Sequence, residues 1–524
     1  MKKALAWLTL AAVVLTGCNQ TVAAVNPTEY INEPYNYTQP LHVKQDLYRN
    51  FYAVTVPSFY DNDGDGVGDL QGIAWNMDYI ANLNCNGLYI SSVLSGADSL
   101  KNAVSDYYSI DPAFGTLEDM AFLLDECKMR AITLIMEMPL NHTSTQHTWF
   151  TLAVESLKAG DFDNQYVNYY NFTTESSKEG YYPVEGTAYY YQAINGSEKP
   201  DLNLNNETLR ADLQDALQYW LERGVGGFCF TGVEDYFEND ADATMQVLVW
   251  LVDFCKRIKP ECYVAADANT DFNTTGSLYA SGFDTIMNYG YAGETGRIVK
   301  TVNKTDPLGR YGEAMTYAQR VFAQYTADTV DGNFLSGQNV GRLYDWFAGD
   351  VSKIKLAIGL NAMLGGSNFL FYGEELGLSG AVNVNTAMDW AEVESLGETI
   401  VEGGNTVQPL GSAELQKADP GSIYNYTRLA LRLRQENPEI ARGVAKVATG
   451  IEDEDLSAVF KATDAGTLIV VINTAMETKT IQSPMTLFGA TAMRGYLSPT
   501  GRSATFTQEE LSIPPYGIVV LSAK

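Results

Sequence analysis

The sequence predicts an α/β protein: a (β/α)8 TIM barrel with a domain inserted after the third strand and a C-terminal antiparallel β-sandwich. Three observations predict this fold. Short apolar, β-branched runs alternate with helical periodicity from about residue 45 to 435. A long, tyrosine-rich connection over 141–200 follows the third run. After about residue 440, the pattern changes to that of alternating strands.

Eight runs in the first region have the length and composition of buried strands. They are 51–57, 87–92, 132–139, 227–232, 262–268, 284–289, 334–339 and 368–372. Amphipathic helices lie between them; Thr116 and Asn206 are at cap positions, and Gly224 ends the second helix. Eight β-then-α units fit a closed barrel, in which active sites lie at the C-terminal ends of the strands.

The sequence divides into five predicted regions. They are 1–17 for a signal peptide, 18–44 for a tether, 45–140 with 201–437 for the barrel, 141–200 for the inserted domain and 438–524 for the β-sandwich. A connection as long as 141–200 is usually functional. Its many tyrosines could stack on sugar rings, but we interpret most of them as packing of a small domain against the barrel.

The N-terminus has the features of an export signal. Lys2 and Lys3 precede an apolar stretch over 4–16 that is too short to span a bilayer as a mature helix. The stretch ends in Leu-Thr-Gly-Cys at 15–18, which resembles a bacterial lipobox and implies cleavage before Cys18 and lipidation of its sulfur. A plain secretory signal is the alternative. We therefore expect an extracytoplasmic lipoprotein, attached to the membrane through this lipid.

Charge and cysteine content narrow the possible partners. The formal net charge of −30 argues against nucleic acid and anionic membrane faces. Five cysteines remain after Cys18, an odd number without a CxxC pair, so neither a zinc site nor a disulfide framework is indicated. Isolated buried thiols are the preferred interpretation, with a Cys255–Cys262 disulfide as the alternative.

An acidic loop follows the first predicted strand. Its carboxylates alternate with small residues, which suits the wrapping of a hard cation such as Ca²⁺. The expected ligands are the side chains of Asp61, Asp63, Asp65 and Asp69 and the carbonyl of Val67. Gly72 stands where an EF-hand would need a glutamate, so this would be a different calcium loop. A solvated acidic turn is the alternative.

Several motifs, in order, resemble those of the α-amylase family of glycoside hydrolases. Besides the acidic loop they are Asp-Tyr-Tyr-Ser-Ile-Asp-Pro at 106–112, Asn-His-Thr-Ser at 141–144, Pro-Asp-Leu-Asn at 200–203, Gly-Gly-Phe at 226–228, Phe-Tyr-Gly-Glu-Glu at 371–375 and Met-Asp-Trp at 388–390. The resemblance covers roughly residues 45 to 524. It implies a barrel, a domain inserted after strand three and a C-terminal β-sandwich.

The same resemblance implies a catalytic site whose residues are substituted here. The family's nucleophile position holds Thr231, and Cys229 stands where its strand-four arginine belongs. Asp267 replaces the acid/base glutamate; its shorter side chain would sit about 1–1.5 Å back from the reacting oxygen. Asn339 replaces the third carboxylate. With a neutral nucleophile position and no guanidinium, little stabilises an oxocarbenium-like transition state.

The sugar-contacting positions are altered as well. Asn102 and Ala103 stand where the family has a sugar-stacking tyrosine and an aspartate, and Glu137 stands where strand three carries an aspartate. His142 is unchanged. The resemblance implies that His142, Asn339 and Asp267 could still bind a sugar, although His142 could instead bond only to the strand-end backbone.

We therefore expect an α-amylase-like surface lipoprotein that binds an α-glucan or malto-oligosaccharide without cleaving it. One alternative is a weak or altered hydrolase or transglycosidase, with carboxyls relocated to Glu137, Glu234, Asp235 and Asp267. A second alternative is a structural or interaction subunit of a membrane complex with an unknown protein partner.

Overall fold

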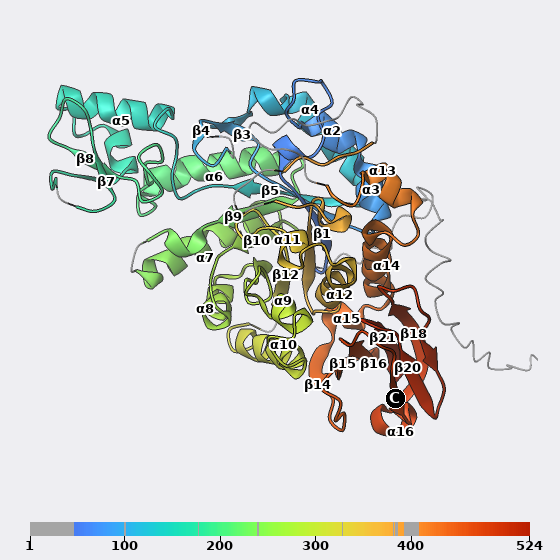
Figure 1. The fold of residues 1–524 in the computed structure, drawn as a ribbon. Coiled ribbons are helices and arrows are strands. Elements are labelled where there is room, and N and C mark those ends of the chain that lie inside the picture. The colour runs from blue at the N-terminus through green and yellow to red at the C-terminus, as the bar shows by residue number, and fades with distance from the viewer. Residues whose placement is uncertain are drawn as a thin grey trace, which may run out of the picture.

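Eight parallel strands close into a barrel at the centre of the molecule (Figure 1). Around the barrel the strand order is β1-β13-β12-β11-β10-β9-β5-β2. The strands are β1 Asn50–Val54, β2 Gly87–Ile90, β5 Thr133–Met138, β9 Gly227–Thr231, β10 Tyr263–Asp267, β11 Thr285–Met287, β12 Val330–Phe334 and β13 Ser367–Phe371. The predicted (β/α)8 barrel is confirmed.

The computed structural model describes residues 47–98, 101–176, 178–237, 240–326, 329–380, 382, 386–391 and 408–524. The predicted signal peptide, Cys18 and the tether lie outside the described residues. Within the described ranges, no helix combines the length and apolarity needed to cross a membrane.

Helices cover the outside of the barrel. The longer ones are α4 Leu117–Met129, α6 Glu207–Glu222, α7 Ala241–Ile258, α10 Gly309–Phe322, α12 Val351–Ala362 and α14 Ile423–Glu436. The predicted caps are present: Thr116 and Asp119 form a capping box on α4, and the Asn206 side chain accepts a bond from Leu209 N at 2.8 Å. Gly224 follows α6 with a φ of 105°, a left-handed conformation that favours glycine.

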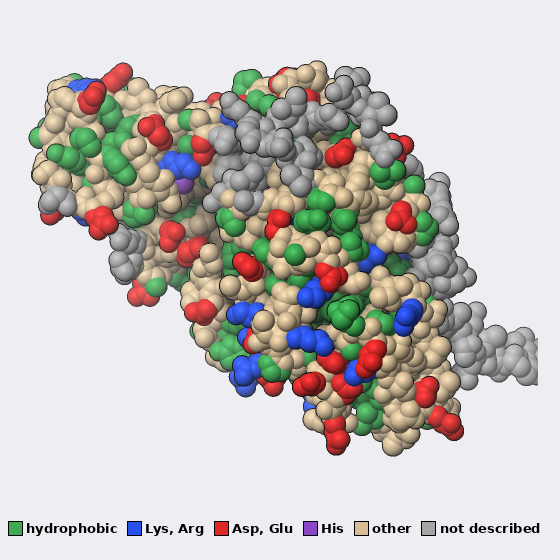
Figure 2. All heavy atoms as spheres, in the orientation of Figure 1, with side chains coloured by type: hydrophobic (Ala, Val, Ile, Leu, Met, Phe, Trp, Pro, Cys, Tyr) green, Lys and Arg blue, Asp and Glu red, His purple; other side chains and the backbone are tan. Residues whose placement is uncertain are grey.

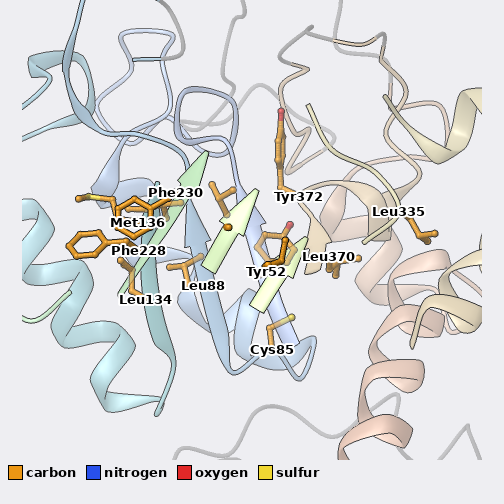
Figure 3. Close-up of a cluster of buried hydrophobic side chains, with 14 of the residues drawn as sticks. Tyr52, Cys85, Leu88, Leu134, Met136, Phe228, Phe230, Leu335, Leu370 and Tyr372 are labelled. Atoms are coloured by element: carbon orange, nitrogen blue, oxygen red, sulfur yellow. The ribbon is translucent and has the colours of Figure 1, made fainter. Parts of the chain in front are cut away.

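Side chains on the barrel strands alternate between two cores. One set faces the covering helices and includes Leu134, Met136, Phe228 and Phe230 (Figure 3). The other set fills the barrel interior, and it consists of Phe51, Ile135, Cys229, Tyr263, Ala265, Met287, Phe334 and Phe369 with a neighbour from the following loop, Ala292. This period of two is the ordinary geometry of a strand, and it fixes which residues reach the mouth of the barrel.

The seventh strand does not lie where the sequence predicts it. The expected range was 334–339, whereas β12 spans Val330–Phe334. The apolar pattern missed this strand because it contains polar residues. The Asn333 amide is fully buried and donates to the carbonyls of Gly365 and Ser367. Gly332 also interrupts the apolar run. The residue is glycine because a β-carbon there would lie 2.6 Å from the Ile286 carbonyl oxygen. Asn339 consequently belongs to the loop beyond the strand.

The segment after β5 carries its own small sheet, which extends from one side of the barrel (Figure 1). It comprises α5 Thr148–Ala159 and the three-stranded sheet of β6 Phe172–Thr173, β8 Tyr190–Gln192 and β7 Tyr181–Pro183. Phe150 of α5 packs edge-on against Tyr170 and Tyr191, at ring-centroid distances of 5.0 and 4.9 Å. These tyrosines act in packing, as interpreted from the sequence for most of the segment.

The C-terminal part has two antiparallel sheets. The larger is ordered β14-β15-β16-β21-β18 and the smaller β17-β20-β19. Their strands are β14 Val444–Val447, β15 Leu456–Thr463, β16 Gly466–Asn473, β17 Lys479–Gln482, β18 Ala490–Leu497, β19 Thr505–Phe506, β20 Glu510–Ile513 and β21 Ile518–Ala523. In β16, Ile469 and Val471 belong to the core of this domain, whereas Leu468, Val470 and Ile472 belong to the core shared with the barrel. Both faces of this strand are therefore covered.

The cysteines of the described chain are free and buried. They are Cys85, Cys127, Cys229, Cys255 and Cys262. Buried free thiols, the preferred interpretation of the sequence, are confirmed, although Cys255 and Cys262 lie close enough for a side-chain hydrogen bond. The alternative disulfide between them does not form in this structure.

Candidate functional site

A ring of eight side chains, one from each barrel strand or from the loop just beyond it, forms the mouth of the barrel. Each stands two residues after a position in the interior layer, because alternate residues of a strand share a face. In order around the barrel they are Ala53, Phe371, Ser336, Tyr289, Asp267, Thr231, Glu137 and Tyr89. All eight line one cavity of about 190 Å³. The strand alternation thus builds the site.

Loops complete the wall of this cavity. Asn102, Glu234, Asn269 and Asn339 contribute polar groups, and Val340 and Met287 contribute apolar ones. The backbone N–H of Asn269 donates to a Glu234 oxygen at 2.7 Å, which holds that carboxyl at the rim. Among the described residues of the lining, none carries a basic side chain. The cavity therefore offers hydroxyl, amide, carboxyl and aromatic groups to a ligand, but no cation.

The structure brings together three of the five residues predicted for the reacting site. Thr231 and Asp267 end the neighbouring strands β9 and β10 and are directly paired in register. Asn339 reaches the same cavity from the loop after β12. Cys229 and His142 are absent from the lining. Of the three residues that line the cavity, Thr231 and Asn339 are neutral, and Asp267 supplies the single carboxyl.

Cys229 belongs to the apolar interior, one layer below the mouth. Its side chain is fully buried among the residues that fill the barrel. Burial raises the pKa of its thiol well above the usual value, and the nearby Asp267 and Glu137 carboxyls raise it further. The thiol is therefore neutral, and this position holds no charge that could assist a reaction at the mouth.

His142 is buried away from the cavity. Neither ring nitrogen has a hydrogen-bond partner among the described residues, so the backbone bond considered from the sequence does not form through the ring. Burial lowers the pKa of His142 to about 4, and the Lys199 ammonium contributes in the same direction. The imidazole is consequently neutral at physiological pH.

The two carboxyls of the ring are each hydrogen-bonded by a tyrosine. Tyr289 donates to Asp267 Oδ1 at 2.7 Å, and Tyr89 donates to Glu137 Oε2 at 3.4 Å. Burial raises the pKa of Glu137 to about 7, and repulsion from Asp267 adds to this shift. Burial also raises the pKa of Asp267. Glu137 is therefore partly protonated near neutral pH and can donate as well as accept a hydrogen bond.

Sequence motifs identified only part of the ring. They did not include Tyr89, Tyr289 or Ser336, which line the cavity between the expected residues, and Phe371 was part of a family motif without being expected to line the site. A usable signal was present, because the residue two positions after the uppermost interior position of each strand stands at the mouth. For Ser336, that signal also required the correct position of β12.

The acidic loop lies apart from this cavity. One carboxylate oxygen from each of Asp61, Asp63 and Asp65 falls within 4.8 Å of the other two. Asp69 instead caps α2 Leu70–Trp75, where its oxygens accept bonds from Gly72 N at 2.7 Å and Asn62 N at 2.8 Å. The oxygen-rich set of three suits a hard cation, whereas Asp69 has a structural role that the sequence did not predict.

The alpha-amylase catalytic-domain family model matches residues 54–406. The chain belongs to the alpha-amylase family. This family match agrees with the closed barrel and with the mouth cavity at the C-terminal ends of its strands. The family resemblance expected from the motifs is thereby confirmed.

Relatives of this alpha-amylase family member cover most of its length. Alpha-amylase 3 of Dictyoglomus thermophilum is 29% identical over 406 residues, which are 76% of this chain and 79% of that protein. The solved structure of Eubacterium rectale Amy13B is 30% identical, covers 93% of this chain and 97% of its own, and superposes with a TM-score of 0.88. The alpha-amylase from H. orenii gives 25% identity and a TM-score of 0.81, over 91% and 100% of the two chains.

Replacing Glu137 with Gln should change how stability depends on pH. The folded-state pKa of Glu137, about 7, lies above its ordinary value of 4.5, so the folded protein binds this proton more tightly than the unfolded chain. Between these pH values the contribution of Glu137 to stability falls as the pH rises, and Gln removes that contribution. We expect the unfolding free energies of wild type and Glu137→Gln to converge or cross across this window. Thermal and urea unfolding from pH 5 to 8 measure it.

Glu185→Gln is the matched control, because Glu185 is exposed in the inserted segment. Its unfolding curve should run parallel to that of the wild type. Parallel curves for Glu137→Gln as well would contradict the assignment of a shifted carboxyl to the barrel mouth.

Proposed function

We propose that this alpha-amylase family member binds an α-glucan or malto-oligosaccharide in the mouth cavity without hydrolysing it. The observation that carries the proposal is the composition of the ring: Thr231 stands on β9, and the ring carboxyls, Glu137 and Asp267, lie on strands separated by β9. The lining also lacks a basic side chain among its described residues.

Hydrolysis of a glycosidic bond needs two carboxyls that flank it. In retaining enzymes they are about 5–5.5 Å apart, one acting as nucleophile and the other as acid/base. Thr231 has a neutral hydroxyl beside Asp267, so that pair of neighbouring strands supplies one carboxyl. The lining offers no positive charge to complement a carboxylate nucleophile or to fix its orientation. The barrier to cleavage is therefore little reduced.

The same cavity retains groups suited to holding a sugar. Tyr89, Tyr289 and Phe371 present aromatic rings, which stack on the apolar faces of sugars. Asp267, Asn269 and Asn339 can hydrogen-bond to hydroxyls. Relatives named alpha-amylase support an α-linked glucan as the ligand class.

A second candidate is an altered hydrolase that uses Glu137 with Asp267. Glu137 has a pKa of about 7, which suits a general acid near neutral pH. The two carboxyls stand two strands apart, which corresponds to about 9.5 Å between strand backbones. Inverting enzymes place their carboxyls roughly 6.5–9.5 Å apart.

Affinity electrophoresis in gels containing starch or dextrin tests binding. We expect the wild type to be retarded, and Asp267→Ala to be retarded less because a sugar hydroxyl loses its acceptor. Glu222→Ala, on the exposed end of α6, is the control and should migrate like the wild type. Absence of retardation by any α-glucan would contradict the binding proposal and favour the structural-subunit alternative.

The same preparations, incubated with malto-oligosaccharides, test catalysis. We expect no turnover by the wild type and measurable turnover by the combined Thr231→Asp, Cys229→Arg, Asp267→Glu and Asn339→Asp variant. The new guanidinium would enter a fully buried site beside Glu137 and Asp267, whose carboxylates can pair with it. Turnover by the wild type that is lost in both Glu137→Gln and Asp267→Asn would instead establish the second candidate.

We also propose that Asp61, Asp63 and Asp65 bind Ca²⁺, with the carbonyl of Val67 as a further ligand. The clustered carboxylate oxygens support this proposal. Ca²⁺ bound to the folded state should raise the midpoint of thermal unfolding, by an amount equivalent to about 2.7 kcal/mol at a hundredfold excess over the dissociation constant. Asp63→Asn should reduce this shift, whereas Asp125→Asn, on the exposed face of α4, should retain it. Equal shifts in the two variants would refute the site.

We propose, finally, that the mature protein is anchored outside the cytoplasm through a lipid on Cys18. The lipobox-like Leu-Thr-Gly-Cys motif at 15–18 supports this localisation. In the bacterial host, wild type should fractionate with membranes, and mass spectrometry of its N-terminal peptide should detect an acylated Cys18. Cys18→Ala should move the protein out of the membrane fraction. A membrane-bound Cys18→Ala protein would argue for a different anchor.

A further inference from the structure

A second cavity, of about 390 Å³, lies at the opposite end of the barrel from the mouth. Its wall combines α10, the glycines before β13, the start of β12, and the segment that joins α15 Glu439–Arg442 to β14. This is the N-terminal end of the strands, where the barrel meets the C-terminal sheets. In barrels of this kind the reaction takes place at the other end, so a ligand here would be independent of the proposed sugar site.

Lys461 of β15 lies behind the wall of this cavity, paired in register with the lining residue Ala445. Its side chain has no exposed surface, and its ammonium has no hydrogen-bond partner and no ion pair among the described residues. A β-carbon placed on Gly365, which lines the cavity, would lie 3.6 Å from Lys461 Nζ and 3.3 Å from Gln319 Nε2. The amine thus lies close to a lining glycine that has no side chain to separate it from the cavity.

An unpaired buried ammonium is costly, because burial removes its hydration without supplying a partner. Burial lowers the pKa of Lys461 to about 7, and the nearby Arg434 guanidinium adds to this effect. Arg434 itself is satisfied by the backbone: it donates to the carbonyls of Ala362, Leu364 and Gly366. Lys461, unlike Arg434, thus lacks an acceptor among the described residues.

Asp331 is the acidic side chain of the cavity wall, but it does not serve as that acceptor. Both of its oxygens receive bonds from the Asn288 amide, at 2.9 and 3.0 Å, and it forms no ion pair with Lys461. Burial raises the pKa of Asp331 to about 7, so its negative charge is incomplete near neutral pH. An incoming anion would meet little repulsion from it.

Further basic groups surround the same space. Arg320 and Arg442 line the cavity. On the face shown in Figure 2, several basic side chains, interspersed with acidic ones, lie over the region where α9 Arg297–Val302, α10 and α12 lie in Figure 1. In a chain of net charge −30, the two arginines of the cavity wall are groups to which an anion would be attracted.

We propose that this cavity binds the anionic group of a small organic ligand, a carboxylate or a phosphate, with Lys461 as its central cation. The anion would occupy the space beside Gly365 and accept bonds from Lys461 Nζ. Gln319 is held in place there by its bonds to Gly443 O and Ala445 N. Met315 and Phe322 form an apolar wall against which the carbon skeleton of the ligand can pack.

Isothermal titration calorimetry on the full chain tests this site, with inorganic phosphate and acetate as probes at constant ionic strength. We expect saturable binding of at least one probe with one site per chain. Tighter binding of phosphate would indicate a phosphate ester as the ligand, and tighter binding of acetate a carboxylate. Lys461→Met should weaken binding roughly tenfold or more, because a charge-assisted hydrogen bond is lost.

Two further variants keep the test decisive. Gly365→Ala preserves the amine but fills the space beside it; Gly365 does not have a positive φ, so alanine introduces no backbone strain. Gly365→Ala should weaken binding as Lys461→Met does. If Lys461→Met fails to fold, the binding measured for Gly365→Ala tests the site in its place. Lys446→Met, on the exposed side of β14, should bind like the wild type. No saturable binding of either probe by the wild type, or undiminished binding in the Gly365→Ala variant, would overturn the proposal.

Discussion

Two-residue alternation along a closed set of strands is the constraint on which this structure depends. Each strand places one side chain in the barrel interior and the next inward-facing one at the mouth, so the packed layer fixes the position of the site above it. Phe51, Ile135 and Phe369 are such interior anchors, and Ala53, Glu137 and Phe371 follow them at the mouth. Because the interior layer is close-packed, it holds in place the strand ends that form the mouth.

This arrangement lets the chemistry of the mouth change without harm to the barrel. Thr231 occupies the end of β9 without altering its register with β10. Cys229 adds a small apolar group to the interior, where a charged residue would need paired carboxylates. Fewer buried charges leave fewer desolvation costs, so neutral side chains at these positions of β9 are compatible with a stable fold.

The sequence predicted correctly the caps and strands that depend on neighbouring residues in the chain. The capping residues Thr116 and Asn206 and seven of the strand positions follow from short-range pattern, and the structure has them. It failed where a polar residue is satisfied by distant partners. Asn333 is buried in β12 because carbonyls more than thirty positions away accept its amide hydrogens. Lys461 likewise lies on a β-strand whose buried face is decided by packing between domains. His142 belongs to a family motif, yet its ring is not part of the cavity lining. A motif alone carries no information on the direction of a side chain.

The strand β16 has a consequence for the autonomy of the C-terminal sheets. Its residues alternate between the core of those sheets and the core shared with the barrel helices, so neither face is solvated. Excision of the barrel would uncover Leu468, Val470 and Ile472 as a continuous apolar stripe on a central strand. Such a stripe on an otherwise well-formed sheet invites self-association. The barrel and the C-terminal sheets therefore depend on each other for a covered core and are expected to unfold as one cooperative unit.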